Sequence, residues 1–424
     1  MLDVRLPHRR GLLIACLVIG LMGTLLRGFA FAVPDRSPDE QLYAGFGRGI
    51  VHDGLAWFPN TVTRFTNEGD VEYPWVHRAG YLSLVALAQL VTGHDDARAG
   101  ETLSTVASVL VLALTGLLAW QVTGPLTAPL AMLFMAVSPL ELAIARRAWQ
   151  DTTLELFTTL LMLVLLASLR AARPWRWRLG FLALGAFTLL VKESAMIVVG
   201  MGGLVMVWDA WRSTRRVTSP LLVVVGGLVT LGLVVGALLL LCGGLENARE
   251  LIRLTPARWA PDDYIRHYQS GGPGYYVVGL AILHPLPWLL GVSAALVALV
   301  GVPWTPPSPG GQDTVVQRVL ALMIVVFLGV SCSYASKNMR FLSPVYPWMA
   351  VAAAVLVMRA AGAVIARLDR AHQRWGWAAV IALSLVMATG DALRFRHYFV
   401  DRWIQDLATP WFTETDAADR AGRN

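Results

Sequence analysis

Long apolar stretches separated by short polar joints make up most of this chain. Many of them approach or exceed the length that a helix needs to cross a membrane, which is about 20 residues. They predict helices over 11–33, 101–121, 125–139, 152–169, 178–191, 194–210, 218–242, 275–300, 316–335, 341–360 and 375–391. The pattern therefore predicts an all-α polytopic membrane protein with about 11 transmembrane helices.

One further apolar stretch, 79–92, is short and amphiphilic, and whether it crosses decides the side of every later joint. Cytoplasmic joints of membrane proteins are enriched in Lys and Arg. With a cytoplasmic N-terminus and a non-crossing 79–92, the arginine clusters at 170–178, 212–216 and 367–374 all lie inside. If the stretch crosses, all three lie outside. We therefore expect 79–92 to be a juxtamembrane or re-entrant helix.

This topology predicts a single transmembrane domain over 1–391. A long external loop at 34–100 contains the juxtamembrane helices, and a second external loop covers 243–274. The remainder, 392–424, is expected to be a short external tail. The first apolar run, 11–33, is longer than the ~7–15 residue core of a signal peptide, so we expect a retained helix.

Composition supports a membrane protein and narrows the partners. Hydrophobic residues make up 56% of the chain and charged residues 15%, whereas a soluble domain carries about 25% charged residues. The net charge of +7 comes from arginines clustered between apolar runs, which indicates membrane orientation and not a nucleic-acid partner. The spacing of Cys16, Cys242 and Cys332 suggests neither a zinc site nor a disulfide framework.

Two adjacent carboxylates, Asp39 and Glu40, follow Ser37-Pro38 just outside the first predicted membrane helix. A proline and acidic residues in the first turn are common at an ordinary helix start. A carboxylate in a partly dry cavity can also abstract a proton from a hydroxyl acceptor. The motif by itself is compatible with both interpretations.

Further charged residues fall on the same predicted side of the membrane. Asp151 opens the helix 152–169, although a helix start also favours an acid. The pair Lys192-Glu193 lies between two apolar segments, where buried charges indicate either mutual pairing or a functional cavity. Arg340 lies in a late basic motif. Such cations suit a lipid phosphate, because guanidinium forks match phosphate oxygens and lysine supplies a point charge.

Taken in order, these motifs resemble those of the GT-C superfamily of membrane glycosyltransferases, in particular the protein O-mannosyltransferase and aminoarabinose (lipid A) transferase group. Each motif is weak alone, but their order and common external side make the set specific. The matching motifs are Asp39-Glu40 at the start of an external loop, Arg48 two turns later, Tyr73 to Arg78 before a juxtamembrane helix, Ser138-Pro139 to Asp151, Gly180 to Lys192, and Arg340-Phe341-Leu342-Ser343-Pro344.

The resemblance implies a GT-C fold and transfer of a hexosyl or pentosyl group from a polyprenyl phosphate to a hydroxyl of a protein, lipid or envelope glycan. It implies a single inverting displacement on the outer face of a prokaryotic cytoplasmic (inner) membrane, with Asp39 as the base. The implied site residues are Asp39, Glu40 and Asp151 for catalysis, Lys192, Arg340, Arg48 and Arg146 for the lipid phosphate, and Tyr43, His77 and His267 as further substrate contacts.

Two questions stay open at this level. The Asp39-Glu40 pair differs from the Asp-x-Asp motif of metal-dependent oligosaccharyltransferase relatives, so a divalent metal is compatible with the pattern but not required by it. The rival function is a transporter or flippase for an anionic lipid-linked substrate. Transporters often carry repeated halves, and none is recognisable here.

Overall fold

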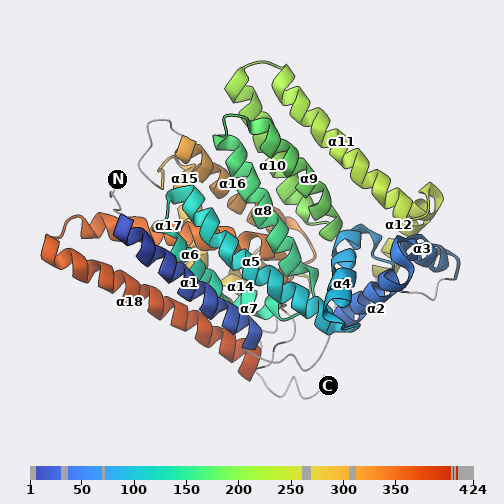
Figure 1. Cartoon of the computed structure of the whole chain (residues 1–424), viewed down its shortest axis with the longest axis horizontal. Helices are drawn as coiled ribbons and strands as arrows, with labels where there is room; N and C mark the ends of the chain where they lie inside the picture. Colours follow the sequence, from blue (N-terminus) through green and yellow to red (C-terminus); the bar gives the residue numbers. More distant parts are fainter. Residues whose placement is uncertain are drawn as a thin grey trace.

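The computed structural model describes residues 6–29, 37–68, 72–259, 269–304, 312–402, 404 and 407–408. Within these residues the chain folds into helices, and its β pairing is limited to an isolated bridge between Ser270 and Ser336. Figure 1 shows a bundle of long helices with a cluster of shorter ones at one end. The long helices are α1 (Leu6–Phe29), α5 (Ala97–Thr123), α8 (Gln150–Arg170), α9 (Pro174–Val191), α10 (Ala195–Thr214), α11 (Thr218–Leu241), α16 (Gln312–Ser333), α17 (Tyr346–Ile365) and α18 (Arg370–Phe395).

Each predicted apolar stretch corresponds to helical structure, but not always to one straight helix. Among the described residues, eight helices are long and apolar enough to cross a membrane, or nine if one bent pair counts as a span. The predicted count of about 11 is therefore not confirmed. The multi-pass, all-helical architecture is confirmed.

Two of the predicted helices are broken, which corrects the sequence-based boundaries. The stretch 125–139 is not one helix: α6 (Ala128–Ala136) and α7 (Pro139–Ala145) meet at a bend of 62°. The stretch 275–300 divides into α14 (Tyr275–Leu283) and α15 (Pro285–Leu299). Both second halves begin with proline, which has no N–H to donate to the preceding turn and is well suited to the first position of a helix.

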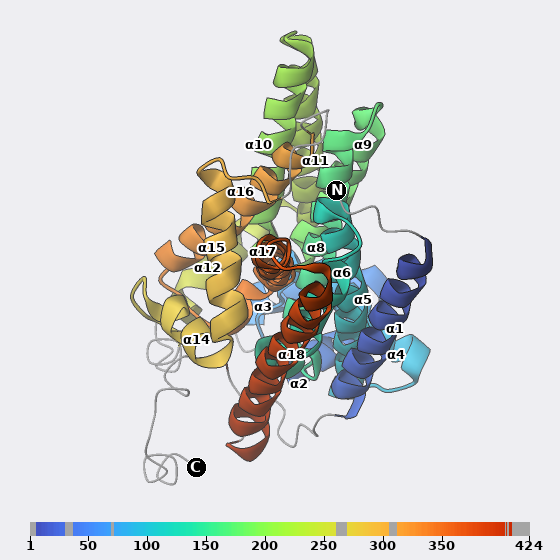
Figure 2. The same cartoon turned by 90° about the vertical axis from the view of Figure 1, so that its left-hand side faces the viewer.

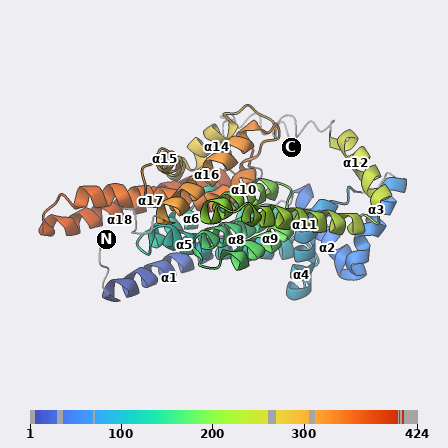
Figure 3. The same cartoon turned by 90° about the horizontal axis from the view of Figure 1, so that it is seen from above.

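The short helices at one end are α2 (Pro38–Asp53), α3 (Trp57–Glu68), α4 (Ala79–Thr92) and α12 (Leu245–Trp259). Figures 1 and 3 place all four together beside the ends of the long helices. A 3₁₀ turn, η1 (Gly54–Ala56), joins α2 to α3, and another, η2 (Val76–Arg78), leads into α4. The predicted 79–92 helix is therefore present, with α4 packed against α2 and α5.

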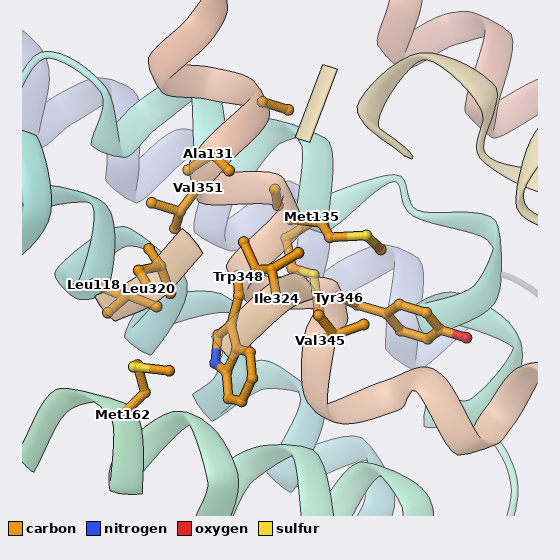
Figure 4. Close-up of a cluster of buried hydrophobic side chains, with 14 of the residues drawn as sticks. Leu118, Ala131, Met135, Met162, Leu320, Ile324, Val345, Tyr346, Trp348 and Val351 are labelled. Atoms are coloured by element: carbon orange, nitrogen blue, oxygen red, sulfur yellow. The ribbon is translucent and has the colours of Figure 1, made fainter. Parts of the chain in front are cut away.

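The apolar core lies where α17 passes between the other long helices. Trp348 at the start of α17 is completely buried, and α5, α6 and α8 contribute Leu118, Met135 and Met162 around it (Figure 4). On the other side, α15 packs against both α16 and α17, with α14 leading into it (Figure 2). A second apolar cluster joins α2, α3 and α4 to the ends of α8 and α9. The second cluster fixes the short helices to the bundle.

Candidate active site

Asp39 and Glu40 both lie in the first turn of α2, but they face different surroundings. Successive helical residues are rotated by about 100° around the axis. The Asp39 side chain keeps 41% of its surface exposed, whereas that of Glu40 is fully buried. Glu40 Oε2 accepts a hydrogen bond from the Ser37 backbone N–H at 2.7 Å, which closes the start of the helix.

Glu40 connects α2 to the joint between α7 and α8. Its Oε2 lies 2.7 Å from Arg147 Nη2, and its Oε1 accepts a hydrogen bond from the Ala148 backbone N–H at 2.8 Å. A carboxylate that is buried and held by three donors is poorly placed to take a proton from an incoming acceptor. Glu40 therefore links α2 to the joint between α7 and α8, and Asp39 is the more accessible of the two carboxylates.

Asp151, Lys192 and Arg340 meet beside Asp39, although they come from distant parts of the chain. Lys192 Nζ lies 2.5 Å from Asp151 Oδ1, and both side chains are buried. Arg340 Nη2 lies 3.4 Å from Asp39 Oδ2, and its Nε lies 3.9 Å from Asp151 Oδ2. Neither Arg340 Nε nor Asp151 Oδ2 has a hydrogen-bond partner among the described residues. The carboxylate contacts of Arg340 are thus long, and its Nε–H is left to donate to a ligand.

The local backbone structure around Arg340 places its side chain beside Asp39 and Asp151. It lies in the 3₁₀ segment η3 (Met339–Val345), which precedes α17, and the Asn338 side chain accepts a hydrogen bond from the Arg340 backbone N–H at 3.1 Å. Ser343 Oγ donates to the Asp151 backbone carbonyl at 3.1 Å, which ties η3 to the start of α8. The Lys192 ammonium also lies 4.7 Å from the centre of the Phe341 ring.

A second charged group adjoins the first through Tyr43. Arg78 Nη1 donates to the Tyr43 hydroxyl at 2.7 Å, and the same guanidinium holds Glu193 through Nε at 3.2 Å and Nη2 at 2.9 Å. Burial raises the pKa of Tyr43 to about 12, so its hydroxyl stays neutral at physiological pH. Burial by itself would raise the pKa of Glu193, but the Arg78 guanidinium outweighs it and lowers the pKa to about 2.

His77 forms part of this second group as a neutral side chain. Burial, reinforced by the neighbouring Arg78 charge, lowers the pKa of His77 from 6.5 to about 4. Its Nε2 lies 3.6 Å from Glu193 Oε2. The His77 ring also contacts the rings of Tyr73 and Trp75, at centroid distances of 6.2 and 5.4 Å. The result is an aromatic surface with a neutral imidazole at its edge.

The lowered pKa of His77 predicts a specific pH dependence of stability. Between pH 6.5 and about 4 the unfolded chain binds a proton on this imidazole that the folded chain does not, so stability falls as pH falls through that window. We expect the His77→Gln variant to lose thermal stability less steeply than the wild type over this range. Thermal unfolding in detergent at a series of pH values measures this slope. The control is His94→Gln, because His94 is exposed. Equal slopes for His77→Gln and the wild type would contradict the prediction.

Not every residue expected at the site lies there. Arg48 Nη1 donates to the Asp95 carbonyl at 2.9 Å, and Arg146 Nη1 donates to the Gly28 carbonyl at 2.8 Å, away from the Asp151 cluster. The structure therefore does not bring Arg48 or Arg146 to the residues that surround Arg340. His267 lies outside the described residues.

Four residues at the site have no assigned role in the sequence prediction: Arg78, Arg147, Glu193, and Trp149, whose ring centre lies 4.5 Å from Arg340 Cζ. Three of them are sequence neighbours of the expected residues His77, Arg146 and Lys192, and the sequence pattern does not say which side chain of each pair faces the cluster. The described residues contain no group of three or more His, Cys, Asp or Glu side chains that could hold a metal ion.

Comparison with known proteins identifies structures that share this fold. Residues 81–239 match the family model described as dolichyl-phosphate-mannose-protein mannosyltransferase. No curated protein sequence matches the chain. Among solved structures, ArnT from Cupriavidus metallidurans is 15% identical, with a TM-score of 0.54 over 92% of this chain and 72% of ArnT.

Two further structures share the fold over most of this chain. The oligosaccharyltransferase AglB from Archaeoglobus fulgidus, solved with an inhibitory peptide and a dolichol-phosphate, has a TM-score of 0.61 at 12% identity. That match covers 91% of this chain, but the chain spans only 55% of AglB. The arabinosyltransferase EmbB from Mycobacterium smegmatis has a TM-score of 0.54 at 14% identity, over 81% of this chain and 30% of EmbB. The chain is therefore a multi-pass membrane protein with the GT-C fold that resembles the ArnT and protein mannosyltransferase group.

Proposed function

We propose that the chain transfers a sugar from a polyprenyl-phosphate carrier to a hydroxyl acceptor on the outer face of a prokaryotic inner membrane. The acceptor hydroxyl oxygen bonds to the anomeric carbon of the sugar, and the Asp39 carboxylate takes the proton of that hydroxyl. The bond between that carbon and the phosphate oxygen breaks at the same time, and the polyprenyl phosphate leaves with the electron pair. A single displacement of this kind inverts the anomeric centre.

The observation that carries this proposal is the contrast between Asp39 and its neighbours. Asp39 is the half-exposed carboxylate of the cluster, and Arg340 lies 3.4 Å from it. Arg340 makes only long contacts with Asp39 and Asp151, and its Nε–H has no hydrogen-bond partner among the described residues. Displacement of a phosphate requires a base beside the attacking hydroxyl and cations beside the leaving phosphate. Lys192, held against Asp151 at 2.5 Å, supplies a second cation for the leaving phosphate.

The second group supplies the contacts suited to a sugar. Binding sites for small molecules combine aromatic surface with a few placed polar groups. Tyr73, Trp75 and His77 form such a surface, and the neutral imidazole can both donate to and accept from sugar hydroxyls. Tyr43, whose hydroxyl accepts from Arg78, connects this surface to the helix turn that carries Asp39. We therefore place Tyr43 and His77 beside the transferred sugar.

Release of the carrier tests the proposed function directly. Purified full-length protein is incubated with undecaprenyl-phosphate-linked hexose and pentose donors and with membrane extract as the source of acceptor. We expect enzyme-dependent release of undecaprenyl phosphate, measured by mass spectrometry. Translocation of the lipid in proteoliposomes without release from any donor would instead establish the flippase function and reject the transferase.

A further inference from the structure

Trp149 lies in the joint between α7 and α8, two residues before Asp151, and is almost completely buried. Its indole N–H donates to Ser37 Oγ at 3.1 Å, and its backbone carbonyl accepts from Ser104 Oγ at 3.2 Å. Ser37 precedes α2 and Ser104 lies in α5. The indole ring is therefore tied to the start of α2, and its backbone is tied to α5.

Two guanidinium groups lie over this one ring. The Arg147 Cζ is 4.7 Å from the ring centre and the Arg340 Cζ is 4.5 Å from it, both within the roughly 6 Å range of cation–π attraction. Arg147 is also held by Glu40 at 2.7 Å. Arg340 has no comparably short carboxylate contact, because its approach to Asp39 is 3.4 Å. The Trp149 ring is also nearer to the Arg340 guanidinium than the Phe341 ring, whose centre lies 5.7 Å away.

We propose that Trp149 is a positioning residue that holds the Arg340 guanidinium in the plane in which it binds the donor phosphate. The inference rests on the proposed function, because it names how that site holds its ligand. A guanidinium grips a phosphate through paired N–H groups of fixed geometry, so its plane must be set before binding. Long contacts to Asp39 leave the plane free to turn, and a buried, anchored indole face prevents this.

Binding of undecaprenyl phosphate itself, without a sugar, tests this role separately from turnover. We expect Trp149→Leu to weaken the affinity of the detergent-purified full chain by about tenfold, and Trp149→Phe, which keeps a ring face, to weaken it by less. Once Arg340 is replaced by Lys, which cannot stack in the same way, Trp149→Leu should have little further effect. The matched control is Trp304, also buried and with its indole N–H donating to the Ala294 carbonyl at 2.8 Å. Trp304→Leu should lower thermal stability without changing the affinity.

Several results would overturn the inference. Wild-type affinity in a folded Trp149→Leu protein would do so, as would full additivity with Arg340→Lys. If Trp149→Leu does not fold, Trp149→Phe and Ser37→Ala take its place, and unchanged affinity in both counts against the proposal. A wild type that binds undecaprenyl phosphate but releases none from any donor rejects the proposed function alone. A wild type that does not bind it rejects both.

Discussion

Replacement of Asp39 by Asn should lower the rate of carrier release by about 10²–10⁴-fold, the range that a general base contributes. Asn has nearly the shape of Asp but cannot accept the proton of the acceptor hydroxyl. The side chain is 41% exposed and its contact with Arg340 is long at 3.4 Å, so removal of its charge should cost little stability. Initial rates at saturating donor, together with thermal unfolding, measure both effects.

Asp53 provides a matched control for this substitution. It lies at the other end of α2, its side chain is 44% exposed, and it contacts His52. Asp53→Asn removes the same charge from the same helix at similar exposure, and it should leave the rate unchanged. If Asp39→Asn releases the carrier as fast as Asp53→Asn does, Asp39 is not the base.

The second large effect is expected on stability, from Arg27 in α1. This guanidinium is fully buried and donates to Ser108 Oγ at 2.5 Å and to the Met135 carbonyl at 3.1 Å, with Glu141 at 3.9 Å. Replacement by Met would leave the buried Glu141 without its cation. Loss of one partner of a buried ion pair typically costs about 3–5 kcal/mol, so Arg27→Met should lower the free energy of unfolding by that amount.

Chemical unfolding in mixed micelles measures this loss, with the exposed Arg10 on the same helix as the control. Arg10→Met removes an equal charge without a buried partner and should change stability by less than about 1 kcal/mol.

A further variant, Glu155→Gln, tests a buried acid of α8 that interacts electrostatically with Arg27 and Glu141. No described group donates a hydrogen bond to either Glu155 oxygen, so a neutral side chain of the same shape should be tolerated. Equal unfolding free energies for Arg27→Met and Arg10→Met would show that the buried cation contributes no net stability.

The sequence was sufficient to predict the membrane architecture because hydrophobicity is a local property of the chain. Runs such as 101–121 and 218–242 are too apolar for a soluble surface, and they form α5 and α11 as expected. The sequence was also sufficient to place charged residues at the joints between the helices. Asp39, Asp151 and Lys192 each stand at the end of an apolar run, so helices that cross together bring them to one level of the bundle.

The division of roles within each motif depended on the tertiary structure. Asp39 and Glu40 differ by one residue in sequence, but α2 rotates them apart, so that one faces Arg340 and the other faces Arg147. The partner of Glu40 is more than one hundred residues away, and no local pattern encodes that contact. The sequence likewise does not distinguish Arg146 from Arg147. In the folded chain it is Arg147 that faces Glu40. Helix ends follow from composition, but the direction of a side chain at a helix end is decided by the distant segment packed against it.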